Sequence, residues 1–175
     1  TATHAGKSAT CTVTQSAGEI TYGAWKVTIT ANPTTIAAAG GTSTLTYSAV
    51  RDVLTNGVVT STEKATPTVS GSATGFTRSG ATVTAANNTT TSSRSVTYTA
   101  THEGKSATCT VTQSAGSKQY ASWSDWTVTV SANPTTIART GGTSTITASA
   151  TRTRTWTWNG VSGSGGTESE KGTPA

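Results

Sequence analysis

The sequence TATHEGKSATCTVTQSAG at residues 99–116 repeats TATHAGKSATCTVTQSAG at residues 1–18, with a single difference, Glu103 in place of Ala5. The two copies lie 98 residues apart. Self-similarity at a fixed period is the sequence signature of an array of structural units. The chain is therefore predicted to contain parts of several similar units.

Two further repeats support this period. The sequence ANPTTIA occurs at residues 31–37 and 132–138, and GGTST occurs at residues 40–44 and 141–145. Each pair is 101 residues apart. The difference from 98 indicates that small insertions separate otherwise similar units, with a period near 100 residues.

The period divides the chain into three predicted parts. Residues 1–18 would be the C-terminal strand of a preceding unit, residues 19–116 a complete unit, and residues 117–175 the N-terminal part of a following unit. The two incomplete units would expose strand edges and apolar faces. Either the polypeptide continues in both directions, which we favour, or neighbouring chains complete the units by strand addition.

The composition favours strands and turns. Of 175 residues, 67 are Ser or Thr, whereas 32% are hydrophobic and 11% are charged. Thr is β-branched and suits a pleated sheet, and a sequence this poor in Leu, Glu and Lys makes poor helix. No run approaches the roughly 20 apolar residues of a membrane span. The net charge of +5 comes from scattered residues, so nucleic acid is not an expected partner.

Alternation within the complete unit predicts individual strands. The segment WKVTIT alternates apolar and polar residues, which places Trp25, Val27 and Ile29 on one face of a strand. Asn56-Gly57, between two short apolar pairs, predicts a two-residue hairpin turn. Roughly seven strands fit the unit. The predicted fold class is all-β, as tandem immunoglobulin-like β-sandwich modules.

Several of these segments also carry a resemblance to a known family. The sequences YTATHEGKSA, ATCTVTQSAG and ANPTTIAAAGGTSTLT resemble bacterial immunoglobulin-like repeat modules, including the BACON-like type, which occur in tandem in surface proteins of gut bacteria and their phages. The resemblance implies an extracellular place on a cell or virion surface, and a role as spacer, stalk, adhesin part or fibre decoration. It brings no shared catalytic residues and no cofactor.

Reactive residues are few. Cys11 and Cys109 occupy equivalent positions, one per unit, and are expected to be small core residues rather than an inter-chain link. His4 and His102 lie in a predicted turn with too few neighbouring ligands for a metal site. No nucleophile, base and acid can be assembled around the few Asp residues. We therefore expect neither an enzyme nor a metal or cofactor site.

One segment could bind a ligand. Period two places Arg152, Arg154, Trp156 and Trp158 on one face of a strand. If exposed, this face could bind sugar rings or a protein through stacking and cation–π contacts. The alternative is that the Trp side chains pack in the core or against a neighbouring unit, with the Arg stems at the rim.

Other aromatic residues follow the predicted unit boundaries closely. Trp25, Trp123 and Trp126 are expected to pack in the core or at the junctions and to stiffen the array. In a turn between strands, Asn87 and Asn88 each begin an N-x-[ST] sequon, which makes them candidate glycosylation sites.

Together these patterns predict a non-enzymatic structural segment of an extracellular rod or fibre. Its expected partners are neighbouring copies of the same unit or chain. The alternative is a carbohydrate-binding or host-surface-binding module that uses the Arg and Trp face of residues 152–158, with glycans as the partner.

Overall fold

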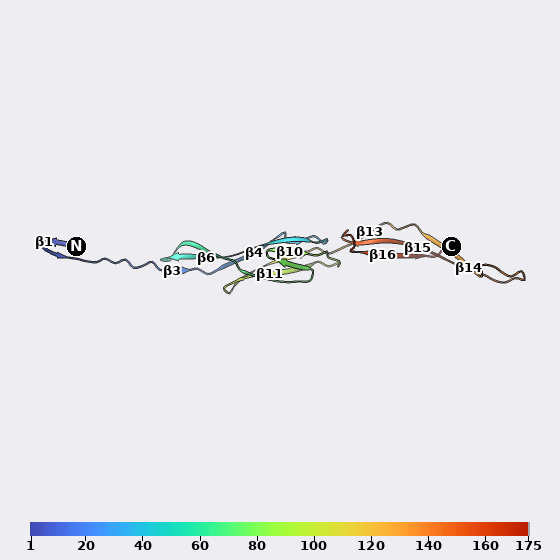
Figure 1. Cartoon of the computed structure of the whole chain (residues 1–175), viewed down its shortest axis with the longest axis horizontal. Coiled ribbons are helices and arrows are strands. Elements are labelled where there is room, and N and C mark those ends of the chain that lie inside the picture. Colours follow the sequence, from blue (N-terminus) through green and yellow to red (C-terminus); the bar gives the residue numbers. More distant parts are fainter. Residues whose placement is uncertain (175) are drawn as a thin grey trace.

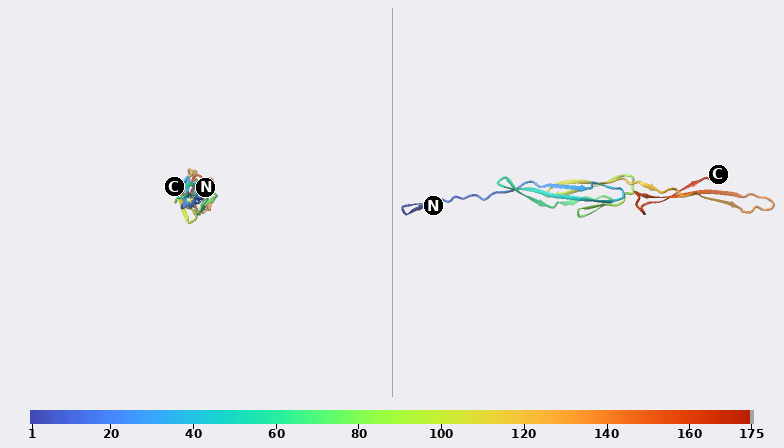
Figure 2. Two further views of the ribbon diagram at one scale, coloured as in Figure 1. Left: turned by 90° about the vertical axis from the view of Figure 1, so that its left-hand side faces the viewer. Right: turned by 90° about the horizontal axis from the view of Figure 1, so that it is seen from above.

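The computed structural model describes residues 1–174. Within them the chain forms sixteen strands and no helix, so the predicted all-β class is confirmed. The strands lie along one long axis, with the first hairpin at one end and the C-terminal strands at the other (Figures 1 and 2). No helix of the described residues is long and apolar enough to cross a membrane.

Residues 1–18, called here the N-terminal segment, form a small hairpin followed by extended chain. β1 (Ala2–His4) pairs antiparallel with β2 (Lys7–Ala9). The remaining residues of the segment belong to no strand, and all eighteen residues are exposed. The segment therefore lacks a packing partner in this structure.

Residues 19–116, called here the central unit, contain two sheets. The first is a six-stranded sheet in which the long strand β6 (Gly41–Thr55) pairs with four others. The other strands of this sheet are β3 (Ile20–Tyr22), β4 (Lys26–Asn32), β7 (Val58–Ala65), β9 (Phe76–Ser79) and β10 (Thr82–Ala85).

The second sheet of the central unit has four strands in the order β5-β12-β11-β8. Their bounds are β5 (Thr35–Ile36), β8 (Thr68–Ser70), β11 (Arg94–His102) and β12 (Lys105–Gln113). β12 packs on β4 of the first sheet. The buried core cluster takes Ile29 and Leu45 from the first sheet, and Tyr98 and Val111 from the second. Apolar residues on the facing sides of the two sheets thus form one core.

Residues 117–174, called here the C-terminal unit, contain a single sheet of four strands. They are β13 (Lys118–Tyr120), β14 (Thr127–Asn133), β15 (Thr145–Trp158) and β16 (Gly166–Gly172). β15 pairs with the other three, as β6 pairs with β3, β4 and β7 in the central unit. The repeated sequence is thus accompanied by a repeated pairing of four strands.

The strand pattern tests the predicted hairpin turn. Asn56 and Gly57 form the turn between β6 and β7, with φ of 53° and 79°, so the predicted hairpin is confirmed. The strand that leads into this turn, β6, is continuous over residues 41–55. Its first half lies over the core. Its second half projects beyond the core with β3 and β7, and we call this three-stranded projection the arm.

Candidate functional site

The end of the central unit nearest the C-terminal unit is held by a buried polar side chain. Gln113 is fully buried, and its Nε2 donates hydrogen bonds to the carbonyl oxygens of Ala37, Ala38 and Ala86 at 2.8–3.1 Å. Its Oε1 accepts a 2.7 Å bond from Arg94 Nε. A buried amide that is satisfied in this way fixes the loops that it joins.

Asn88 fixes the adjacent loop. Its side chain is fully buried, and Nδ2 donates to the carbonyl oxygens of Ser92 and Ser114, both at 2.9 Å. Its Oδ1 accepts from the backbone and the hydroxyl group of Thr90. A sugar on Asn88 Nδ2 would replace one of its two hydrogens and so remove one of these two bonds. The neighbouring Asn87 Nδ2 is also buried. Both amide nitrogens are therefore buried in this structure, and glycosylation of Asn87 and Asn88 stays a prediction.

The central and C-terminal units meet at this loop without a flexible linker. Asn159 Nδ2 donates to Asn87 Oδ1 at 2.7 Å and to the carbonyl oxygen of Asn88 at 2.9 Å. The amide of Gly116, the last residue of the central unit, donates within that unit to the carbonyl oxygen of Thr90 at 2.7 Å. A Cβ atom at position 116 would lie 2.1 Å from the Asn88 carbonyl oxygen, so only glycine fits this approach. We call these contacts the junction.

The turn that reaches the junction has a counterpart in the central unit. Asn159 has φ of 54°, and its Oδ1 accepts from the amide of Ser117 at 2.8 Å. Asn56 has φ of 53°, and its Oδ1 accepts from the amide of Glu19 at 2.9 Å. Asn56 therefore fastens the tip of the arm. Asn159 fastens the tip of the corresponding projection of the C-terminal unit, which β13, β16 and the second half of β15 form and which we call the C-terminal arm. Only the Asn159 side chain bonds a neighbouring unit within residues 1–174.

The arm of the central unit contains a stacked cation. The guanidinium carbon of Arg51 lies 4.2 Å from the ring centre of Tyr22 and 4.6 Å from that of Trp25. Its Nε bonds Glu63 on the paired strand at 2.7 Å. These contacts place Arg51 between two aromatic rings with its charge paired, which stabilises the arm where it leaves the core.

The C-terminal unit has the same arrangement with one more Arg side chain and one more aromatic ring. Arg152 lies 4.6 Å from the ring centre of Trp126 and 4.9 Å from that of Trp123. Arg154 lies 4.5 Å from Trp123 and 4.0 Å from Tyr120. Rings and guanidinium groups thus alternate along the sheet, and we call these five residues the ladder.

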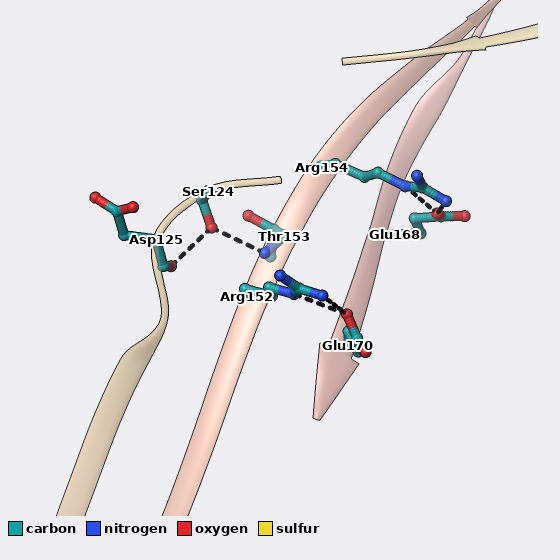
Figure 3. Close-up of polar contacts among 7 residues, drawn as sticks. All are labelled: Ser124, Asp125, Arg152, Thr153, Arg154, Glu168 and Glu170. Carbon is teal, nitrogen blue, oxygen red and sulfur yellow. Dashed lines mark hydrogen bonds and ion pairs between the residues drawn. The ribbon is translucent and has the colours of Figure 1, made fainter. Parts of the chain in front are cut away.

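Acidic residues on the next strand complete the ladder. Glu170 and Glu168 of β16 bond Arg152 and Arg154, with Nε to oxygen distances of 2.7 and 2.5 Å (Figure 3). All four side chains are partly exposed, so the ion pairs are screened by solvent and each adds little alone. Their main effect is to orient the guanidinium planes against the rings.

A loop holds the two Trp rings in place. Between β13 and β14 the chain follows β15 closely, and the amide of Ser124 donates to the carbonyl oxygen of Thr153 at 2.8 Å. The Ser124 hydroxyl oxygen accepts from the amide of Thr153 at 3.0 Å (Figure 3). Since Trp123 and Trp126 flank this attachment, the bonds fix where their rings lie on β15.

The residues predicted as a ligand-binding face divide into two groups. Arg152 and Arg154 already contact rings and carboxylates of their own unit. Trp156 and Trp158 pack edge to face, with ring centres 6.2 Å apart, and Lys118 Nζ lies 4.0 Å from the Trp156 ring centre. The four side chains do follow one face of β15, as period two requires. In this structure, other side chains of the same unit cover much of the face that was predicted to bind a ligand.

The contacts and exposure of Trp25, His102 and the two Cys residues are also defined by the structure. Trp25 is buried, and its Nε1 donates to Glu103 Oε2 at 3.0 Å at the tip of the β11–β12 hairpin. The ring of His102 meets Trp25 edge-on at 4.4 Å. Cys109 is half-buried, and burial raises the pKa of its thiol above the ordinary value. Cys11, its counterpart, is exposed.

Sequence reasoning missed both the junction and the composition of the ladder. The Asn-Gly pair at 56–57 recurs at 159–160, and this recurrence was the signal for the junction turn. The ladder had a signal too, because an Arg on the long strand faces Tyr and Trp in both units. Aromatic residues were expected at the junction itself, whereas the two side-chain bonds across it come from Asn159.

No family model, curated protein or solved structure matches this chain. The arrangement of strands, the junction and the ladder are therefore the basis for any functional argument.

Proposed function

We propose that this chain is a segment of a non-enzymatic structural rod or fibre, built from tandem immunoglobulin-like β-sandwich units of the bacterial, BACON-like kind. In this proposal the rod is extracellular, on a bacterial surface or a phage particle. Each unit supports its neighbours, as in other linear arrays.

The observation that carries the proposal is the junction. Two consecutive units joined by a flexible linker would move independently. Here only residues 114–117 separate β12 from β13, and Asn159 of the C-terminal unit donates two hydrogen bonds to Asn87 and Asn88 of the central unit. A short connection with hydrogen bonds across it restricts relative motion of the two units, as a structural rod requires.

The ladder is the second line of support. The C-terminal arm has three strands outside any two-sheet core and no second sheet to pack on, and a sheet of three strands needs a packed apolar face to be stable by itself. The alternating rings and guanidinium groups give this arm a packed face of its own. The junction depends on a stable C-terminal arm, because that arm carries Asn159 at its tip.

Solution scattering and electron microscopy of the chain test the proposal. A rod segment gives particles several times longer than wide, with one dominant length. A compact globule, or a broad distribution of bent shapes that reveals independent units, would overturn it. Source material should also show linear arrays, and isolated compact particles there would contradict the role in a fibre.

A glycan-binding role is the second candidate, and one observation favours it. Trp156 and Trp158 are only half-buried, and Trp126 is 42% exposed, so aromatic surface remains along the same face. A glycan array with the chain and its Trp156→Ala and Trp158→Ala variants tests this role. Thr155→Ala, on the opposite face of β15, is the matched control. Binding that both Trp variants lose and the control keeps would support it.

A further inference from the structure

The two arms carry the same short sequence at their tips. Asn56-Gly57 and Asn159-Gly160 form the two turns, and a Val residue follows each pair. Asparagine loses its side-chain amide most readily when glycine follows it, because glycine has no side chain to hinder attack by its backbone nitrogen. The tip of each arm is therefore chemically suited to deamidation.

The reaction needs only water besides the chain itself. The backbone nitrogen of Gly160 attacks Cγ of Asn159 and gives up its proton, and Nδ2 leaves as ammonia. Water then opens the succinimide ring at one of its two carbonyl groups, which leaves aspartate or isoaspartate at position 159. The turn is closed by the Val161 amide, which donates to the Trp158 carbonyl oxygen at 2.9 Å, and the Gly160 amide has no hydrogen-bond partner within residues 1–174. No other group therefore occupies the attacking nitrogen.

The closed junction restrains the side chain that has to react. Asn159 Oδ1 accepts from the Ser117 amide, and Nδ2 donates to Asn87 Oδ1 and to the Asn88 carbonyl oxygen. Ring closure turns the side chain toward its own C-terminal peptide bond and removes Nδ2, so both bonds to the central unit have to break. Deamidation of Asn159 therefore proceeds from the open junction.

The product cannot rebuild the same contact. A carboxylate only accepts hydrogen bonds, and both partners of Asn159 Nδ2 are acceptors as well. Asn87 can turn its amide and offer its Nδ2, which has no hydrogen-bond partner in this structure. The backbone carbonyl group of Asn88 has no such alternative, so closing the junction would press two oxygen atoms together. Isoaspartate would also lengthen the backbone of the two-residue turn by one carbon atom.

We propose that Asn159 is a deamidation site, and that its conversion to aspartate or isoaspartate opens the junction irreversibly. Opening exposes the side chain to the reaction, and the reaction then prevents closing. The inference rests on the proposed function, because it names a chemical change that regulates the contact between consecutive units of the rod.

Asn56 provides an internal reference for the reaction rate. Within residues 1–174 its side chain has one hydrogen bond, from the Glu19 amide, whereas the Asn159 side chain has three. Gly and Val follow both residues, so the two sites should react at similar rates in denaturant. In the folded chain the two additional bonds should slow Asn159 by about 5–150 times relative to Asn56.

Peptide mapping by mass spectrometry, during incubation at mildly alkaline pH, measures both rates. Asn87→Ala removes one of the two acceptors, so it should accelerate the reaction at Asn159 by about 2–12 times and leave Asn56 unchanged. Thr89→Ala, at an exposed position of the same loop, is the matched control and should change neither rate. Equal rates at Asn56 and Asn159 in the folded parent chain, or no acceleration in Asn87→Ala, would overturn the inference.

Asn159→Asp tests the consequence separately from the reaction. Hydrogen exchange at the Gly116 amide, which lies beside the Asn88 carbonyl group, should be at least as fast as in Asn159→Gly, because the carboxylate adds repulsion to the loss of two bonds. Asn56→Asp should leave exchange at Gly116 as it is in the parent chain. If Asn159→Asp kept the slow exchange of the parent, conversion would not open the junction and the inference would be wrong.

The rod itself is tested by the shape of freshly prepared, unmodified chain. A long particle with the wrong reaction rates would leave the rod in place and remove the deamidation site. A chain that bends freely before any conversion would remove the rod instead.

Discussion

Replacing Asn159 by glycine isolates the hydrogen bonds across the junction. Glycine adopts the positive φ of this turn at no steric cost, so Asn159→Gly removes side-chain bonds without straining the backbone. It removes the two bonds from Nδ2 to Asn87 and Asn88, and the bond from the Ser117 amide. Asn56→Gly is the matched control, because it removes the equivalent bond from the Glu19 amide and no contact between units of this chain.

The expected magnitude follows from the number of bonds. A neutral hydrogen bond contributes about 0.5–1.5 kcal/mol net, so the two bonds to the central unit contribute about 1–3 kcal/mol to closing the junction. Every 1.4 kcal/mol is about a factor of ten, and local opening should become about 5–150 times more frequent.

Amide hydrogen exchange is the assay, because the Gly116 amide bonds Thr90 directly beside the Asn88 carbonyl group that Asn159 binds, so opening of the junction exposes it. Exchange at Gly116 should accelerate by that factor in Asn159→Gly and stay unchanged in Asn56→Gly. Solution scattering should show a broader range of lengths for the first variant only. Equal exchange at Gly116 in both variants would refute the claim that the Asn159 side chain holds the units together.

Three further predictions concern the ladder, the buried Tyr98 and the two Cys residues. Arg152→Met keeps the apolar stem but loses two ring contacts and an ion pair, so denaturant unfolding of the C-terminal unit, followed by Trp fluorescence, should show a loss of about 1–3 kcal/mol. Arg139→Met, at an exposed loop position, should change stability by less than about 0.5 kcal/mol. Burial raises the pKa of Tyr98 and of Cys109, and both groups are neutral when protonated. The free energy of unfolding should therefore keep this contribution at pH below the ordinary pKa values, 9.0 for Cys109 and 10.0 for Tyr98. It should fall as pH rises through the higher pKa values of the folded state. Tyr98→Phe should weaken that fall. In dilute solution Cys11 should react quickly with a thiol reagent and Cys109 slowly, with Cys11→Ser abolishing the fast phase.

The strand pattern was predictable because it depends on local alternation. Trp25 and Ile29 are buried, and Val27 between them is partly buried on the same side. Val96, Tyr98 and Ala100 do the same on β11. In each case period two alone assigns the face, and Thr at the intervening positions is exposed or nearly so.

The site was less predictable because it depends on pairing between strands. The sequence placed Arg152, Arg154, Trp156 and Trp158 on one face, but it could not say which rings lie across from the two Arg residues. That depends on the loop that Ser124 attaches to β15 and on the register with β16. The buried state of Asn88 was equally hidden, since a sequon reads the same whether its amide meets solvent or two carbonyl groups.

The C-terminal arm is longer than the arm of the central unit, and this difference has a consequence for spacing along the proposed rod. Asn56 follows Arg51 by five residues, whereas Asn159 follows Arg152 by seven. Two residues of antiparallel strand span about 7 Å, and they return the side chains to the same face. A unit can therefore move its neighbour outward in increments of about 7 Å, each adding one more ring and one more cation. In the proposed rod, the axial repeat would then depend on the length of the arm in each unit, even between units of nearly identical sequence.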